Sequence, residues 1–128
     1  MHVVAAEESP RRNDLESENL AKTIVDLMVA KLGEDVLLLD IRPVSMIADY
    51  FVICSGGSER QVQSIYEDIL MALQKMGIRP LHSEGTATSG WVLMDYSSVI
   101  VHIFLPQTRR YYNLEQLWKD ARTVIRIL

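Results

Sequence analysis

Residues 49–62 read DYFVICSGGSERQV, and this stretch decides the fold. Its first half, Asp49 to Ser55, is rich in aromatic and β-branched residues and predicts a strand. Two glycines break the strand, Ser58 can then cap a helix, and Gln61 three residues later completes a capping box. Helically spaced apolar residues continue the pattern up to Gly77: Val62, Ile65, Tyr66, Ile69, Leu70, Leu73 and Met76. The stretch therefore predicts a strand followed directly by a long helix.

Helices and strands are predicted on both sides of this unit. A polar leader at residues 1–16, expected to be disordered, precedes a single domain at residues 17–128. Within that domain the remaining elements are a helix at 17–32, strands at 36–41, 79–84, 91–96 and 99–105, and a short helix at 114–118 that Asn113 can cap. The strand at 99–105 is apolar on both faces, so we expect it near the centre of the sheet, and Pro106 should end it. The order α-β-β-α-β-β-β-α predicts the α/β class, with a mixed β-sheet flanked by helices.

Composition bounds the classes of function. The chain has 128 residues and a net charge of −4, so we expect no binding to naked nucleic acid through charge alone. Residues 107–128 form a basic end, with 5 Lys/Arg and 2 Asp/Glu, which we interpret as a solvated terminal segment. The single cysteine, Cys54, lies in an apolar run and reads as a small buried residue, so neither a disulfide nor a multi-cysteine zinc site is expected. The chain shows no apolar stretch of membrane-spanning length and no signal peptide, and a cytoplasmic location is expected.

Candidate catalytic and metal sites are weak. The turn Gly56-Gly57-Ser58 could present backbone N–H groups to a phosphate, although a turn with a helix cap accounts for the same residues. This strand-turn-helix unit also resembles the opening of the nucleotidyltransferase fold, whose two-metal chemistry needs paired carboxylates. The following strands offer only Glu84 and Asp95, one each. His82, Glu84 and His102 could come together at a metal, but packing is the commoner role of a strand histidine. We therefore expect no enzyme activity, no cofactor and no metal.

A surface feature is more informative. In residues 90–96, GWVLMDY, side chains alternate between the two faces of a strand. Trp91, Leu93 and Asp95 fall on one face, and the residues between them fall on the other. An aromatic anchor with an aliphatic and an acidic neighbour is typical of a protein-docking surface. The alternative is that Trp91 belongs to the core.

Three motifs follow one another along the chain. The first is ADYFVICSGGSERQV at residues 48–62, the second is GWVLMDY at 90–96, and the third is VHIF at 101–104 with RYYNLEQLW at 110–118. Together they resemble the signature segments of the Iojap family of ribosomal silencing factors, over about residues 17–120. The resemblance implies a nucleotidyltransferase-like topology without that superfamily's activity.

The resemblance also implies a partner and a mechanism. It implies binding to the large ribosomal subunit through its fourteenth protein, at the surface that meets the small subunit. A bound factor would then sterically block subunit joining and lower translation when nutrients are scarce. The docking residues that the resemblance implies are Trp91, Leu93 and Asp95, with His102, Pro106, Tyr111 and Tyr112 as neighbours. Gln107-Thr108 departs from the acidic residue that the family often has after the proline.

Two alternatives remain open. One is a nucleotide-binding or nucleotidyltransferase-like enzyme that uses the turn at Gly56 to Ser58. The other is a self-associating module, in which the strand with Trp91 forms a homodimer.

Overall fold

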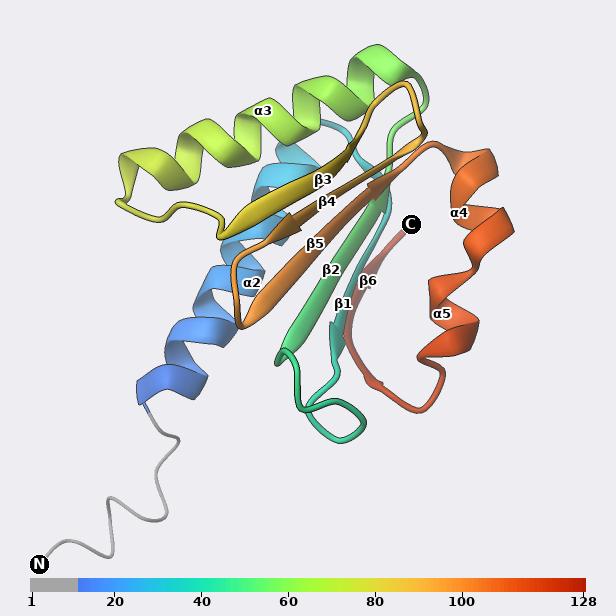
Figure 1. The fold of residues 1–128 in the computed structure, drawn as a ribbon. Helices are drawn as coiled ribbons and strands as arrows, with labels where there is room; N and C mark the ends of the chain where they lie inside the picture. The colour runs from blue at the N-terminus through green and yellow to red at the C-terminus, as the bar shows by residue number, and fades with distance from the viewer. Residues whose placement is uncertain (1–11) are drawn as a thin grey trace, which may run out of the picture.

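The computed structural model describes residues 12–128. Along the chain, the elements are α2 (Arg12–Ala30), β1 (Glu34–Asp40), β2 (Tyr50–Ser55), α3 (Glu59–Lys75), β3 (His82–Thr86), β4 (Trp91–Asp95), β5 (Val99–Phe104), α4 (Pro106–Tyr112), α5 (Leu114–Leu117) and β6 (Arg122–Ile127) (Figure 1). Within this part of the chain, no helix has both the length and the apolar character needed to cross a membrane.

All six strands form one sheet, in the order β3-β4-β5-β2-β1-β6. β2 and β5 run parallel, and the other four neighbouring pairs are antiparallel. The predicted α/β class with a mixed, helix-flanked sheet is therefore confirmed. Every residue of β5 is buried, and β5 lies inside the sheet, as its two apolar faces predicted.

The two faces of the sheet are covered differently. α2 and α3 lie across one face, and α4 and α5 lie beside the other (Figure 1). The first, which we call the helix-covered face, carries the larger apolar cluster, in which Val52, Val92, Met94 and Val101 pack with helix residues such as Ile65. The second, which we call the open face, carries a smaller cluster that includes Phe104 and Leu114, with Trp91 and Trp118 packed against it.

The Ser58 cap predicted before α3 is present, and the returning bond from Gln61 falls on Gly57, one residue before the cap. The Gln61 amide N–H donates to Ser58 Oγ at 3.1 Å, and the Gly57 N–H donates to Gln61 Oε1 at 2.8 Å. The Gln61 side chain also donates to the carbonyl oxygen of Leu32 at 2.9 Å and so ties the start of α3 to the loop after α2. The bond to Ser58 satisfies one of the N–H groups that a helix start leaves without an internal partner.

Several boundaries differ from those predicted. α2 begins at Arg12, five residues before the expected start, so only residues 1–11 of the expected leader lie outside the described residues. β3 covers residues 82–86 instead of 79–84, and Gly85 therefore belongs to a strand. Gly85 has a φ of +80°, which L side chains rarely adopt, and a Cβ there would collide with the carbonyl oxygen of Trp91. Glycine therefore fits this position of the strand, and a larger residue does not.

The prediction that Pro106 only ends a strand was incomplete. Pro106 stands in the first turn of α4, where its fixed φ and missing N–H are tolerated. Asn113 does not cap the next helix through its side chain. It adopts a left-handed conformation with a φ of 49°, and its N–H donates to the carbonyl oxygen of Arg109 at the end of α4. Asn113 therefore ends one helix and redirects the chain into another.

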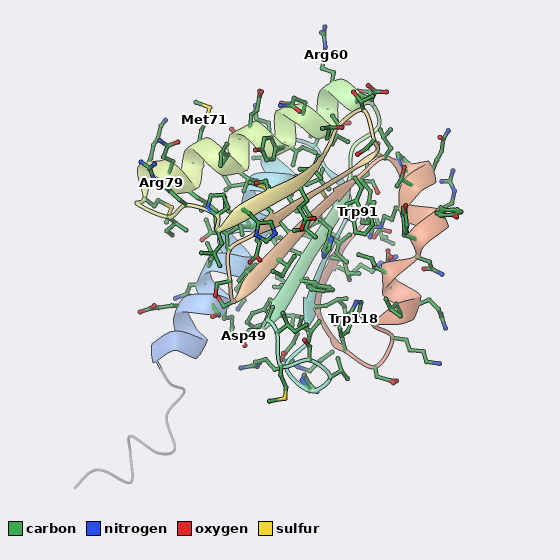
Figure 2. All side chains as sticks on the ribbon, viewed as in Figure 1. Asp49, Arg60, Met71, Arg79, Trp91 and Trp118 are labelled. Carbon is green, nitrogen blue, oxygen red and sulfur yellow. The ribbon has the colours of Figure 1, made fainter. Side chains whose placement is uncertain are left out.

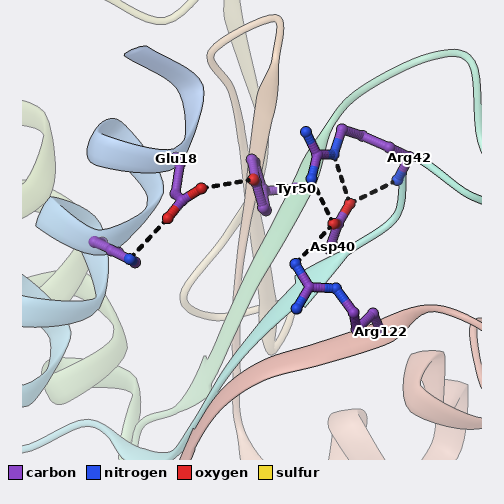
Figure 3. Close-up of polar contacts among 6 residues, drawn as sticks. Glu18, Asp40, Arg42, Tyr50 and Arg122 are labelled. Carbon is purple, nitrogen blue, oxygen red and sulfur yellow. Dashed lines mark hydrogen bonds and ion pairs between the residues drawn. The ribbon is translucent and has the colours of Figure 1, made fainter. Parts of the chain in front are cut away.

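The interpretation of the basic end as a solvated segment was wrong. Its last residues form β6, which pairs antiparallel with β1. Asp40 accepts two hydrogen bonds from the guanidinium of Arg42, at 2.7 and 2.9 Å, and one from Arg122 of β6 at 3.2 Å (Figure 3). The hydrogen bonds from Arg42 lower the pKa of Asp40 to about 2. Arg126 makes a second, bidentate ion pair with Asp35, at 3.0 and 3.1 Å. Two ion pairs therefore help to hold this edge strand against the sheet.

Candidate docking surface

β4 separates its side chains between the two faces as predicted. Val92 and Met94 are 3% and 0% exposed in the core beneath α2 and α3. Trp91, Leu93 and Asp95 are half-buried on the open face. The same strand therefore supplies both core and surface, and the surface residues are spaced by two.

Cross-strand pairing places further groups beside these residues. Leu93 lies between Glu84 of β3 and His102 of β5, while Trp91 is paired with Phe104. Asp95 is paired with His82 at the edge of the sheet. Residues paired in register share a face, so the open face carries polar groups at its β3 edge and aromatic groups towards its centre.

Trp91 is held firmly without being buried. Its indole N–H donates to Nδ1 of His102 at 3.1 Å. Its ring stacks on Phe104 with centroids 5.0 Å apart, and Tyr112 of α4 lies at 4.7 Å on a tilted plane. Figure 2 shows Trp91 and Trp118 on the side of the sheet where α4 and α5 lie. Trp91 is therefore neither a core residue nor a free side chain, and its fixed orientation reduces the entropy lost on binding.

His102 is the most unusual polar group of the open face. It is 4% exposed, and burial lowers its pKa to about 3, so the ring is neutral at physiological pH. Because Nδ1 accepts the hydrogen bond from Trp91, the proton lies on Nε2. Nε2 is buried, and no group in the described chain accepts its hydrogen bond. Such an unsatisfied donor is unfavourable in an isolated protein.

Carboxylates line the β3 edge of the open face. Asp95 Oδ1 accepts the Ser97 N–H at 2.7 Å, so this residue also stabilises the turn into β5. Its other oxygen lies 3.6 Å from Nδ1 of His82, and His82 Nε2 lies 3.0 Å from Glu84 Oε2. The predicted proximity of His82 and Glu84 is therefore present, and among residues 12–128 no group of three or more potential ligands could hold a metal ion.

Two hollows flank Leu93. One, of about 240 Å³, lies towards α4 and is lined by Glu84, Gly85, Ser89, Trp91, Leu93 and Tyr112. The other, of about 270 Å³, lies towards the loop between β1 and β2, and we call it the loop hollow. Its walls include Ile41, Ile47, Phe51, Leu93 and Trp118, with His102 among its lining residues and His82, Glu84 and Asp95 at its acidic end. Leu93 and Glu84 border both hollows, so the predicted docking strand forms a ridge between them.

Of the other predicted docking residues, some lie beside Trp91 and one lies apart from it. Tyr112 touches Trp91, and the 82% exposed Tyr111 packs edge-on against Tyr112 with centroids 5.0 Å apart. Pro106 lies apart from this group and lines a different hollow beside Arg109. Sequence reasoning missed Ile47 and Trp118, which line the loop hollow. For Ile47, the signal in the sequence was the apolar pair Met46-Ile47 in the loop after Pro43. For Trp118, no local pattern indicated a place beside the hollow.

The turn at Gly56 to Ser58 is already occupied by contacts within the chain. The Gly57 N–H is bonded to Gln61, and the Glu34 carboxylate lies close to Gly57. Arg109, the buried cation nearby, donates to the Ser55 hydroxyl at 3.0 Å and to Glu115 at 2.8 Å. A negative group and a compensated arginine make this end of the sheet unfavourable for an added phosphate.

The cysteine reading agrees with the structure. Cys54 is fully buried on the helix-covered face, and burial raises the pKa of its thiol to about 12. The thiol is therefore protonated at physiological pH and is no nucleophile in this state.

Comparison with known proteins gives one consistent result. The family model described as "Ribosomal silencing factor during starvation" matches residues 14–127. A protein of Halalkalibacterium halodurans named "Ribosomal silencing factor RsfS" is 41% identical over 110 residues, which cover 86% of this chain and 94% of that protein. A mouse protein named "Mitochondrial assembly of ribosomal large subunit protein 1" is 30% identical over 105 residues, covering 77% of this chain and 46% of its own.

A solved structure agrees with these sequence matches. A crystal structure of a Chromobacterium violaceum protein superimposes with a TM-score of 0.76 at 29% identity, covering 80% of this chain and 85% of that one.

Proposed function

This chain belongs to the ribosomal silencing factor family, and from that premise we propose that its open face docks on the large ribosomal subunit. The proposed contact is the fourteenth protein of that subunit, at the surface that the small subunit also uses. A factor bound there excludes the small subunit by volume alone and lowers translation when nutrients are scarce. No chemical step is required, and the chain acts as a regulator and not as an enzyme.

The observation that carries this proposal is the prearranged Trp91. An indole fixed by the His102 hydrogen bond and by stacking on Phe104 presents its exposed edge in one orientation. Leu93 beside it adds apolar area, and the nearby carboxylates form a polar border. Rigid aromatic groups surrounded by polar ones are the usual centre of a protein interface.

Charge favours a protein surface over bare RNA. The open face offers Glu84 and Asp95 near the ridge, and the chain carries a net charge of −4. Three arginines of the basic end are paired internally, Arg109 with Glu115, Arg122 with Asp40 and Arg126 with Asp35. Phosphate binding by this face would bring like charges together, whereas a basic ribosomal protein would be attracted to it.

The direct test is sedimentation with isolated ribosomal subunits. We expect the wild-type chain to co-sediment with large subunits and not with small ones. The double variant Trp91→Ala with Asp95→Asn should stay in the supernatant, while Met71→Ala, an exposed change on α3, should behave as wild type. Asparagine keeps an oxygen for the Ser97 N–H, so the turn is retained while the charge is removed. Co-sedimentation of the folded double variant at the wild-type level would overturn this assignment.

A further inference from the structure

The loop between β1 and β2 presents apolar side chains to solvent. Met46 and Ile47 are 103% and 87% exposed. The loop is nevertheless ordered by its own hydrogen bonds: the Val44 N–H donates to the carbonyl oxygen of Ile41 at 3.0 Å, and the Ile47 N–H donates to Ser45 Oγ at 3.1 Å. A fixed, exposed apolar group beside a hollow is typical of a binding surface.

The loop hollow has a chemical character of its own. Its walls are largely apolar, with Ile47 from the loop, Leu93 from β4 and Trp118 after α5. Its β3 edge carries the carboxylates of Glu84 and Asp95. An occupant must therefore combine an apolar side chain with a neighbouring positive charge.

A buried donor adds a third requirement. Trp91 occupies Nδ1 of His102, and the two ring nitrogens of an imidazole point away from each other, so the Nε2–H is directed away from Trp91. His102 lines the loop hollow, and its Nε2 has no hydrogen-bond partner in the described chain. The Phe51 ring, edge-to-face with the imidazole at 4.7 Å between centroids, can offer only a weak contact. Because this nitrogen is buried, an oxygen supplied from outside reaches it when a side chain in the wall of the hollow moves aside on binding.

We propose that the loop hollow receives a segment of the large-subunit protein in which an apolar side chain stands beside a Lys or Arg, and that a carbonyl oxygen of this segment accepts the Nε2–H of His102. The inference rests on the proposed function and states what the open face recognises in its partner. It enlarges the docking surface from the ridge at β4 to the loop of Met46 and Ile47. It also gives the unsatisfied nitrogen its acceptor, which an isolated chain lacks.

The first test is a charge placed at the mouth of the hollow. Ile47→Asp should weaken binding of the purified large-subunit protein by about tenfold or more in calorimetry, because a hydrated carboxylate replaces the apolar wall that the apolar side chain of the occupant would contact. Met71→Asp is the matched control, with the same change of charge at an exposed apolar residue of α3, and should leave the affinity within about twofold. Wild-type affinity of Ile47→Asp would overturn the inference.

The second test observes the hydrogen bond directly in the full-length protein. Nitrogen-edited NMR should show the His102 proton on Nε2 in the free chain, and that proton signal should move to lower field on saturation with the large-subunit protein. The Trp91 indole N–H serves as an internal reporter of docking at the ridge. A shift of the Trp91 signal with an unchanged His102 signal would overturn the inference while leaving the proposed function intact.

Two further outcomes separate the alternatives. If neither signal responds and no heat is released, the proposed function fails and the inference fails with it. If light scattering shows that the chain dimerises alone and that Ile47→Asp abolishes the dimer without changing partner affinity, the occupant is a second copy and the inference is wrong.

Discussion

The helix-covered face and the open face of the sheet are built from alternate residues of the same strands, yet helices bury them to different extents. On the helix-covered face, Val92 and Met94 disappear beneath α2 and α3. On the open face, beside which the short helices α4 and α5 lie (Figure 1), Trp91 and Leu93 are half-buried. One strand therefore carries both the residues that stabilise the domain and those proposed to contact its partner.

The two faces also differ in where their polar groups lie. The open face keeps a buried N–H of His102 without an acceptor and carboxylates at its β3 edge. Burying a polar group without a partner lowers stability. Among the described residues, Tyr96 Oη on the helix-covered face also lacks a partner, but of these two groups only the His102 nitrogen of the open face belongs to a residue that lines a hollow bordered by carboxylates.

Substitutions on the two faces of β4 should separate these two roles most strongly. Trp91→Ala removes the fixed aromatic group and should weaken binding to large subunits by about 100-fold. Met94→Ala leaves a cavity beneath the helices and should lower the free energy of unfolding by about 2–5 kcal/mol. Calorimetry of the folded fraction should give Met94→Ala an affinity close to wild type. Equal loss of affinity in both variants would break the distinction between the faces.

A substitution that weakens the attachment of the edge strand β6 should affect neither face directly. Asp40→Asn removes the charge that holds Arg42 and Arg122 and should lower the free energy of unfolding by about 2–3 kcal/mol in urea denaturation at pH 7. In the wild type this contribution is present above pH 3.8 and is lost as the pH falls towards about 2, because the folded carboxyl holds its charge longer than the unfolded one. Unchanged ribosome affinity is expected, and a large loss of affinity would place β6 in the docking surface.

The pH dependence of stability tests the state of His102. Its pKa is about 3 in the folded chain and about 6.5 when exposed, so below pH 6.5 the unfolded chain takes up a proton that the folded chain refuses. Stability should therefore fall as the pH drops from 6.5 towards 3, by about 2 kcal/mol between pH 7 and pH 5 from this group. Subtracting the profile of His102→Gln isolates that contribution from those of the carboxylates. Identical slopes in the two proteins would show that the ring is not a neutral buried group.

The smallest expected effect concerns the charge at the β3 edge. Asp95→Asn keeps the acceptor for the Ser97 N–H and removes one negative charge. We expect an affinity about three- to tenfold lower, with a weaker dependence on salt than in the wild type, because an exposed ion pair contributes modestly and is screened. Binding measured at two salt concentrations checks both points. An unchanged salt dependence would mean that Asp95 meets no cation in the partner.

Local patterns allowed the centre of the fold to be predicted. The Ser58 cap on the backbone N–H of Gln61 involves neighbouring residues, and the alternation from Trp91 to Asp95 follows from strand geometry. Both were confirmed because they depend on periodicity and on hydrogen bonds within a few residues. The apolar character of β5 on both faces likewise predicted its central position.

Long-range contacts could not be predicted in the same way. β6 depends on pairs between Asp40 and Arg122 and between Asp35 and Arg126, which are separated by most of the chain. The basic end therefore looked like a solvated segment. Pro106 is compatible both with the end of a strand and with the start of a helix, and tertiary packing decides between them.

The geometry of the open face was predicted in part. The alternation of β4 indicated the ridge, and the family resemblance added His102 and Tyr112, which the structure places against Trp91. The place of Ile47 beside the loop hollow was missed because that hollow forms only when β1, β2 and β4 are brought together.

Subunit joining is the measurement that tests the central claim most directly. Small and large subunits mixed at a Mg²⁺ concentration that favours joining can be resolved on a sucrose gradient, with and without the protein in excess. We predict that the wild-type chain shifts the profile to separate subunits and travels with the large one, whereas Trp91→Ala leaves the joined peak intact. A joined peak that persists with wild-type protein bound to it would contradict the account, because the docking face would then lie away from the surface where the subunits meet.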